Sequence, residues 1–418
     1  MAVQEAGTES TVPELEGALR FVARQPILDL RGRVHGYELL FRSGREACFS
    51  GDGNLATRIM LDNTVVFGLE RLTGGLPAFV NCTLEALTEG LVEVLPASMT
   101  VLEILEDLEP TPELIRACCH LKTLGYRLAL DDFNWKPGIE PLVEFADYIK
   151  VDFKAVNRTR RRELLNRLDG ASVALVAEKV ETQEEYQQAR AEGFTLIQGY
   201  YFCRPSLMEN RKVSANRLSH IEILKLLHGP SIDHRKLTRA LKRDTSLTYR
   251  LLRLVNSPLC AMRQEVSSIQ AALLAVGEDT FRRIATLAIA SELNSGRPEE
   301  LLRMAFVRGR FCERTAGICD LTSNEQYLLG MLSLLPAMMR IPMEELSPSL
   351  PLRDEIREAL LGRANPQRCS LQWLESHERG DWEACDTAAQ ANGLNQAELN
   401  DIYTEAVEWA EAALNLVN

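Results

Sequence analysis

Carboxylate, amide and lysine side chains recur at the ends of short apolar runs in the first 200 residues of this 418-residue chain. They are Glu38, Asn81, Glu103, Asp131 with Asp132, Lys150 with Asp152, Glu178 and Gln198. These residue types hold metal ions or phosphate groups when they meet in one pocket. The sequence therefore indicates a phosphate or metal site, provided that the apolar runs bring their ends together.

Eight apolar runs are predicted to be β-strands, and helical patterns such as 54–69, 111–124, 160–168 and 183–192 alternate with them. The runs are Phe21–Ile27, Val34–Leu40, Ala78–Asn81, Val101–Ile104, Arg127–Leu130, Tyr148–Val151, Val173–Ala177 and Leu196–Gln198. This alternation is typical of an α/β fold with a mainly parallel sheet, and eight repeats predict a closed, TIM-like barrel. In such a barrel the carboxyl ends of the strands share one face, where the chemistry takes place.

Length and periodicity predict a second, helical core after the barrel. Single domains rarely exceed about 300 residues, and beyond residue 216 the apolar residues follow a helical period. We expect a polar tail at 1–19, the barrel at 20–206, a linker at 207–219 and an all-α domain at 220–418. Within the last, Tyr327–Met339 is predicted to be a buried helix broken near Pro336, and Pro342–Pro351 a loop.

Charge and hydropathy limit the classes of function. The net charge of −12 argues against a nucleic-acid binder, which needs a basic face. No apolar stretch reaches the roughly 20 residues of a membrane span, and the N-terminus lacks the features of a signal peptide. We therefore expect a cytoplasmic protein without nucleic-acid or membrane partners.

Each carboxylate also has a simpler interpretation. A single Asp or Glu at a strand end commonly caps the next helix. Capping does not explain why Asn81, Lys150 and Gln198 stand at equivalent places, so the joint set favours a site. The arginines between Arg158 and Arg167 are most simply the solvated face of a helix.

The segment RQPILDLRGRVHGYELLFR (24–42) resembles the opening of EAL domains, the cyclic di-GMP phosphodiesterase family. Glu38-Leu39-Leu40 stands in place of Glu-Ala-Leu. Six further motifs follow in the family's order: FVNCT (79–83), LEILE (102–106), LDDF (130–133), IKVD (149–152), AEKVE (177–181) and QGYYF (198–202).

The resemblance implies a role for each polar residue. Glu38, Asn81, Glu103, Asp131 and Asp132 would hold one or two Mg²⁺ or Mn²⁺ ions, which prefer oxygen ligands. Lys150, Glu178 and Glu38 would be catalytic, and Gln25, Arg42, Gln198 and Asp152 would contact the ligand. The implied reaction is metal-assisted hydrolysis of cyclic di-GMP to linear pGpG.

Three features depart from the family pattern, and one of them is the segment between Asn81 and Glu103, which is shorter than in typical active members. DDFNWKPGIEPL (131–142) replaces the loop that follows the paired aspartates in EAL enzymes, and Lys179 replaces the glycine of AEGVE. The ligand residues are kept, whereas the loop that would organise them has changed.

The stretch 237–293 resembles the HDOD domain, a helical relative of the HD phosphohydrolases. Asp244, Leu254-Val255-Asn256-Ser257 and Val276-Gly277 carry this resemblance. Where HD hydrolases have a His–Asp doublet, this chain has Ser333 and Leu334, so we expect no HD-type activity here.

Three functions are compatible with this two-domain organisation. In the first, the barrel binds cyclic di-GMP or a partner, and the HDOD domain transmits this state to other proteins. In the second, the barrel is a working phosphodiesterase and the HDOD domain regulates it. In the third, the chain is a scaffold independent of nucleotide. A homodimer is compatible with each.

Overall fold

The computed structural model describes residues 20–43, 69–203, 215–228, 232–260, 266–350 and 352–417. All eight predicted strands are present and form one closed barrel in the order β1 to β8. Their bounds are β1 Arg20–Asp29, β2 Val34–Ser43, β3 Ala78–Cys82, β4 Thr100–Ile104, β5 Arg127–Leu130, β6 Tyr148–Asp152, β7 Ala174–Glu178 and β8 Leu196–Gln198. The TIM-like barrel expected from the sequence is thus confirmed.

The first strand departs from the parallel arrangement. β1 pairs antiparallel with both β2 and β8, whereas the pairs from β2 to β8 are parallel. A tight turn with a left-handed Gly32 joins β1 to β2. A turn this short cannot carry the crossover that a parallel pair requires, so a hairpin forms instead. Gln25 lies opposite Glu38 in this hairpin.

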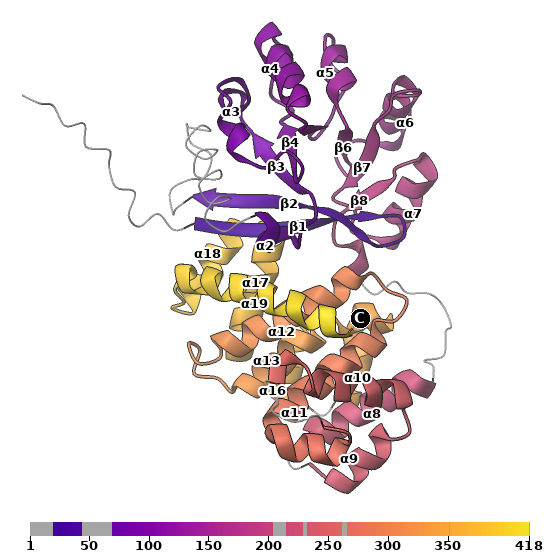
Figure 1. Cartoon of the computed structure of the whole chain (residues 1–418), viewed down its shortest axis with the longest axis vertical. Coiled ribbons are helices and arrows are strands. Elements are labelled where there is room, and N and C mark those ends of the chain that lie inside the picture. Colours follow the sequence, from indigo (N-terminus) through magenta and orange to yellow (C-terminus); the bar gives the residue numbers. More distant parts are fainter. Residues whose placement is uncertain are drawn as a thin grey trace, which may run out of the picture.

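Helices lie around the barrel, most of them above its first hairpin in the view of Figure 1. They are α2 Leu69–Thr73, α3 Leu84–Thr88, η1 Leu91–Val94, α4 Pro112–Thr123, α5 Glu140–Phe145, α6 Arg158–Arg167, α7 Gln183–Glu192 and η2 Tyr201–Cys203. A capping box of Thr182 and Glu185 starts α7, and a left-handed Gly193 ends it. The helix predicted over 54–69 lies, apart from Leu69, outside the described residues.

The lower part of the barrel interior is filled by one layer of apolar side chains. These are Ile27, Phe79, Val101, Ala129, Tyr148, Val176 and Leu196. They close the end of the barrel opposite the carboxyl ends of its parallel strands, so the polar residues have a floor of packed side chains beneath them.

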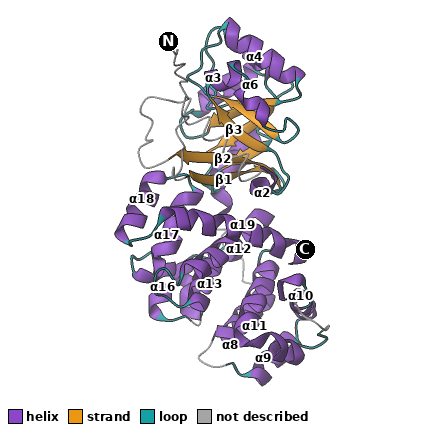
Figure 2. Cartoon of the chain, turned by 60° about the vertical axis from the view of Figure 1, so that its left-hand side comes forward, coloured by secondary structure: helices purple, strands orange, loops and turns teal. Residues whose placement is uncertain are grey.

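The second half is entirely helical within the described residues (Figure 2). Its elements are α8 Ala215–His228, α9 His234–Leu241, α10 Thr245–Val255, η3 Pro258–Cys260, α11 Ile269–Leu293, α12 Glu299–Thr315, α13 Ser323–Leu332, α14 Leu335–Met339, α15 Met343–Leu346, η4 Ser347–Ser349, α16 Asp354–Leu360, η5 Pro366–Arg368, α17 Cys369–Glu378, α18 Trp382–Ala391 and α19 Gln396–Val417. None of the described helices is both long enough and apolar enough to cross a membrane.

Prolines mark two places where the helical prediction can be compared with the structure. The break between α13 and α14 falls just before Pro336, as expected. The loop predicted over Pro342–Pro351 is wrong, because α15 and η4 occupy most of it. Pro342 precedes α15 and Pro348 lies in the first turn of η4, positions where proline is compatible with a helix.

The predicted domain boundary stays a prediction. Residues 204–214, which include most of the expected linker, lie outside the described residues. Helix α8 begins at Ala215, so the last five residues of that linker are helical rather than extended.

The helical half packs against the first hairpin of the barrel. Helices α17 and α19 contact β1, and α19 also contacts α2 (Figures 1 and 2). A single cluster of buried apolar residues continues from the outer layer of the barrel into the helices. β1 and β2 therefore have one face toward the barrel interior and the other toward the second half.

Candidate metal and phosphate site

The ammonium group of Lys150 lies at the centre of the polar cluster. Lys150 is fully buried on β6, and four carboxylates surround it. Its Nζ atom lies 2.6 Å from Glu103 Oε1, 2.8 Å from Asp131 Oδ1, 3.0 Å from Glu178 Oε1 and 3.1 Å from Glu38 Oε2. The four carboxylates come from β4, the residue after β5, β7 and β2. The barrel thus brings together residues that lie up to 140 positions apart in the sequence.

Two amide side chains hold Glu38 from the sides, and a third, that of Gln25, holds one of them. Gln198 donates to Glu38 Oε2 at 2.6 Å and to Gln25 Oε1 at 2.9 Å, and Asn81 donates to Glu38 Oε1 at 3.2 Å. Gln25 is near Gln198 because β1 runs between β2 and β8. These contacts fix the orientation of the Glu38 carboxylate.

Asp132, Asp152 and Lys179 form a second, more exposed group at the rim. Lys179 Nζ lies 2.6 Å from Asp152 Oδ2 and 3.5 Å from Asp132 Oδ2. Asp152 also accepts hydrogen bonds from the backbone amides of Lys154 and Ala155. Lys179 and Asp132 have positive φ angles of 55° and 40°, a region that L residues seldom adopt.

Burial and mutual repulsion control the ionisation of the central carboxylates. Burial raises the pKa of Glu178 to about 8, although the charge of Lys150 opposes the shift. Burial likewise raises the pKa values of Glu103 and Asp131. Burial would also raise the pKa of Glu38, but Lys150 and the hydrogen bond from Gln198 lower it overall. One ammonium group does not balance four buried carboxylates, so the cluster favours either a bound proton, as the raised pKa values indicate, or a further cation.

The donor set fits a divalent cation by its chemistry. Several buried oxygens have no hydrogen-bond partner, namely Asn81 Oδ1, Glu103 Oε2, Asp132 Oδ1 and Glu178 Oε2. Glu103 Oε1 and Asp131 Oδ1 lie close to Lys150 without the angles of a hydrogen bond. Such hard oxygens are the ligands that Mg²⁺ and Mn²⁺ prefer. Among the described residues, no group of three His, Cys, Asp or Glu side chains is already placed to hold a metal ion.

Comparison with known proteins identifies both halves of the chain. The model of the EAL domain matches residues 81–205, and that of the HDOD domain matches residues 219–343. Uncharacterized protein YuxH of Bacillus subtilis is 34% identical over 400 residues, which are 93% of this chain and 97% of that protein. Cyclic di-GMP phosphodiesterase CdgJ of Vibrio cholerae is 32% identical over 404 residues, which are 95% of this chain and 94% of that protein.

The chain belongs to the EAL–HDOD family. Solved structures similar to it include BlrP1 of Klebsiella pneumoniae in a calcium and cyclic di-GMP complex, at 24% identity and a TM-score of 0.39 over 49% of this chain and 58% of that chain. The PaMucR phosphodiesterase in a cyclic di-GMP complex matches at 19% identity and a TM-score of 0.39 over 48% of this chain and 99% of that chain.

The structure brings together nearly all the site residues predicted for the EAL half. Glu38, Glu103, Asp131 and Glu178 contact Lys150, while Asn81, Gln25 and Gln198 contact or flank Glu38. Asp132 and Asp152 lie at the rim with Lys179. The backbone of Arg42 belongs to β2, but its side chain is outside what the structure describes. The functional roles of these residues remain predictions.

The segment that replaces the family's loop after the aspartates is ordered by apolar and backbone contacts. The Phe133 amide donates to the Lys150 carbonyl at 2.8 Å. The rings of Phe133 and Trp135 meet edge to face, and the Arg167 guanidinium lies over Trp135. This segment therefore anchors the backbone that carries Asp131, Asp132 and Lys150.

The HDOD half has different chemistry where HD hydrolases have their doublet. Ser333 donates to the Gly330 carbonyl at 2.7 Å and accepts from Arg308 at 3.1 Å. Arg308 is buried and forms an ion pair with Glu378 at 2.6 Å. The neighbouring Leu334 is buried among apolar residues. These side chains stabilise the helical core through hydrogen bonds and ion pairs.

Sequence reasoning missed the residues that join the two halves. Tyr37 donates to Glu300 Oε2 at 2.8 Å, and Arg24 lies 3.4 Å from Glu411 Oε1. Tyr200 donates to the Glu378 carbonyl. The outward orientation of Arg24 and Tyr37 could have been predicted from the sequence. Each directly precedes a predicted site residue, Gln25 or Glu38, and neighbouring side chains along a strand face opposite sides.

Proposed function

We propose that this EAL–HDOD protein is a divalent-metal-dependent phosphodiesterase that opens cyclic di-GMP to linear pGpG. The observation that carries this proposal is the convergence of Glu38, Glu103, Asp131 and Glu178 on buried Lys150. The full-length similarity to CdgJ, a protein named as a cyclic di-GMP phosphodiesterase, supports the same activity.

The carboxylates and Asn81 would hold the metal ions. Glu38, Asn81, Glu103, Asp131 and Asp132 have suitable oxygens, and Mg²⁺ or Mn²⁺ bound there would activate water and neutralise the phosphate.

The remaining residues would act on substrate and proton. Lys150 would stabilise negative charge on the phosphate, and Glu178 beside it would accept or hold a proton. Gln25 and Gln198 would offer amide groups to the ligand. Asp152 would contact the ligand at the rim, where it holds the Lys179 ammonium group. Arg42 would contribute a charge-assisted hydrogen bond to a phosphate oxygen.

A second candidate is a nucleotide-binding adaptor without turnover. It is favoured by the two lysines, because Lys150 lies among the carboxylates and Lys179 bridges Asp132 and Asp152. Both ammonium groups compete with metal ions for the same oxygens. In this case the HDOD half, as a monomer or a homodimer, would present the nucleotide-bound state to protein partners.

Turnover by the purified full-length chain separates the two candidates. The protein is incubated with cyclic di-GMP and Mn²⁺, and pGpG is followed by chromatography. Glu38→Gln removes one carboxylate charge at constant size, and exposed Glu113→Gln on α4 is the matched control. We expect product from the wild type and from Glu113→Gln, and at least a hundredfold less from Glu38→Gln.

The absence of product from the wild type would contradict the phosphodiesterase proposal. Calorimetric titration with cyclic di-GMP would then distinguish the adaptor, which binds it, from a scaffold, which does not. Equal turnover in Glu38→Gln and wild type would exclude this face of the barrel as the site.

A further inference from the structure

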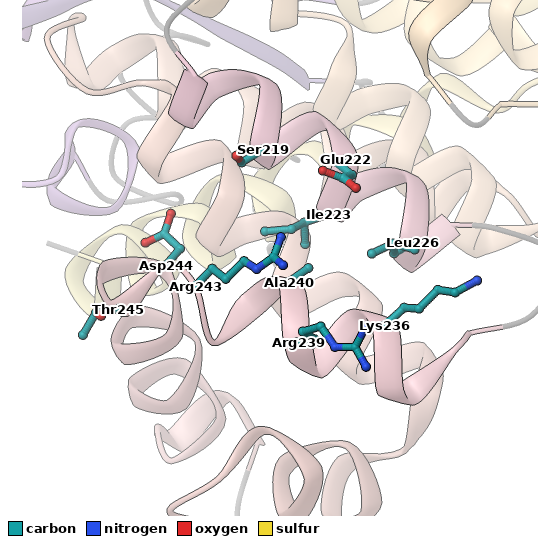
Figure 3. A pocket seen from close by; sticks show the side chains of 10 residues that line it. All are labelled: Ser219, Glu222, Ile223, Leu226, Lys236, Arg239, Ala240, Arg243, Asp244 and Thr245. Carbon is teal, nitrogen blue, oxygen red and sulfur yellow. The ribbon is translucent and has the colours of Figure 1, made fainter.

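A cavity of about 450 Å³ lies in the HDOD half between α8 and the corner of α9 and α10 (Figure 3). It is located at the end of the molecule remote from the barrel (Figure 1). Its volume falls within the range of sites for small molecules, about 300–1,000 Å³. Nothing in the proposed phosphodiesterase reaction uses it.

Three cationic side chains line one wall of the cavity. Lys236, Arg239 and Arg243 are spaced at three and four residues, so they share one side of α9 and its C-terminal extension. Within the described part of the chain, neither arginine forms an ion pair, and Lys236 has only Asp233 at 3.5 Å. These three cations give the wall a local positive charge, although the chain as a whole has a net charge of −12.

The opposite wall, on α8, has a different chemical character. Ile223 and Leu226 give it an apolar surface, and Glu222 places a carboxylate beside them (Figure 3). The other acidic group at the cavity, Asp244, is already engaged. It accepts from the Leu247 amide at 2.9 Å and lies 2.8 Å from His220 Nε2. Among the described residues that line the cavity, Glu222 is therefore the carboxylate available to a bound molecule.

We propose that this cavity binds a guanine nucleotide. Arginine forms paired, charge-assisted hydrogen bonds with phosphate oxygens, so Arg239 and Arg243 would hold the phosphates together with Lys236. The base would lie over Leu226, which is packed beside the buried Ile223. An ionised carboxylate only accepts hydrogen bonds, and guanine offers two adjacent N–H donors on one edge, whereas adenine does not. Glu222 would thus select guanine. This inference is independent of the reaction proposed for the barrel.

Calorimetric titration of the full-length protein with GTP, ATP and pyrophosphate tests the assignment. The double variant Arg239→Gln/Arg243→Gln is expected to weaken GTP binding at least tenfold. Arg235→Gln is the matched control, because Arg235 is exposed on the same helix and does not line the cavity. Glu222→Gln should weaken GTP binding and leave pyrophosphate binding unchanged. Glu38→Gln should bind GTP like the wild type.

Several results would overturn the proposal. GTP affinity that is equal in the double variant and the wild type would place the nucleotide elsewhere. Pyrophosphate that binds as tightly as GTP would indicate a simple phosphate site, and ATP that binds as tightly as GTP would remove the role of Glu222. A wild type that binds none of the three probes would exclude a nucleotide site here. The residues substituted at the cavity and in the control on α9 are exposed, so thermal unfolding should show that these variants are folded.

Discussion

At the scale of single residues, Lys179 determines the character of the rim. Its ammonium group lies between Asp152 and Asp132, so two carboxylates that a cation would otherwise reach already have a counter-ion. Its backbone has a φ of 55°, a conformation in which glycine has no steric penalty. This backbone geometry explains the glycine of the EAL pattern. In this chain, a lysine occupies the position despite the steric cost, and it adds a positive charge to the rim.

Replacement of Lys179 should change the affinity for metal more than the stability of the fold. We expect Lys179→Gly to bind Mn²⁺ about three- to tenfold more tightly, because it frees Asp132 and Asp152. The side chain is about half exposed, at 52%, so loss of its ion pairs should cost only about 0.2–1 kcal/mol. Calorimetric titration with Mn²⁺ measures the effect.

Lys179→Gln separates charge from backbone conformation. If charge is the cause, the Gln and Gly variants will bind Mn²⁺ alike. Wild-type affinity in both variants would show that Lys179 does not compete with metal.

At the scale of elements, β1 and β2 serve two surfaces at once. Gln25 and Glu38 face the interior of the barrel, while Arg24 and Tyr37 face the helices. On the helical side, Glu300 accepts from Tyr37 at 2.8 Å and from Arg303 at 2.6 Å. The strand that positions Glu38 is therefore held in place from the HDOD half.

Two adjacent glutamates on α12 allow this contact to be measured. Glu300 is 3% exposed and Glu299 is 51% exposed, and both lie near Arg303. We expect Glu300→Gln to lower the free energy of unfolding by about 2–4 kcal/mol, since the largely buried Arg303 loses the shortest of its three carboxylate contacts and Tyr37 loses a charged acceptor. Glu299→Gln should cost less than about 1 kcal/mol. Urea unfolding followed by circular dichroism gives both values, and equal losses would contradict the role assigned to Glu300.

At the scale of the whole molecule, the sequence predicted each half better than their arrangement. Periodicity located all eight strands, since alternation within a strand and the glycines after helices are local signals. The antiparallel β1 was missed, because strand direction depends on the length of the turn around Gly32 and not on apolar pattern. The polar cluster was predicted from strand ends alone. The central position of Lys150 and the contact of Tyr37 with Glu300 depend on packing between distant segments, which no local pattern encodes.

The response of the molecule to acid follows from two buried histidines. Burial lowers the pKa of both His228 and His377 to about 3, from 6.5. The unfolded chain therefore takes up these protons first as the pH falls below about 6.5. Each histidine contributes stability that is present above this pH and is lost progressively as the pH falls toward 3.

His377→Phe should reduce this sensitivity to acid. His377 is stacked on Trp373, so an aromatic ring of similar shape can replace it. Between pH 7 and pH 5 we expect the wild type to lose about 2 kcal/mol more stability than the variant. Urea titrations followed by tryptophan fluorescence at the two pH values provide the comparison. Parallel losses in the two proteins would show that His377 is not the titrating group.

The shared hairpin has a consequence for how such proteins can be recombined. A chimaera that joins this barrel to a foreign helical domain within residues 204–214 would bury Arg24 and Tyr37 against a surface without Glu411 and Glu300. The unmatched charge would disturb the strand that carries Glu38. The two halves are therefore not interchangeable modules, and a functional hybrid has to transfer the contact residues of both partners together.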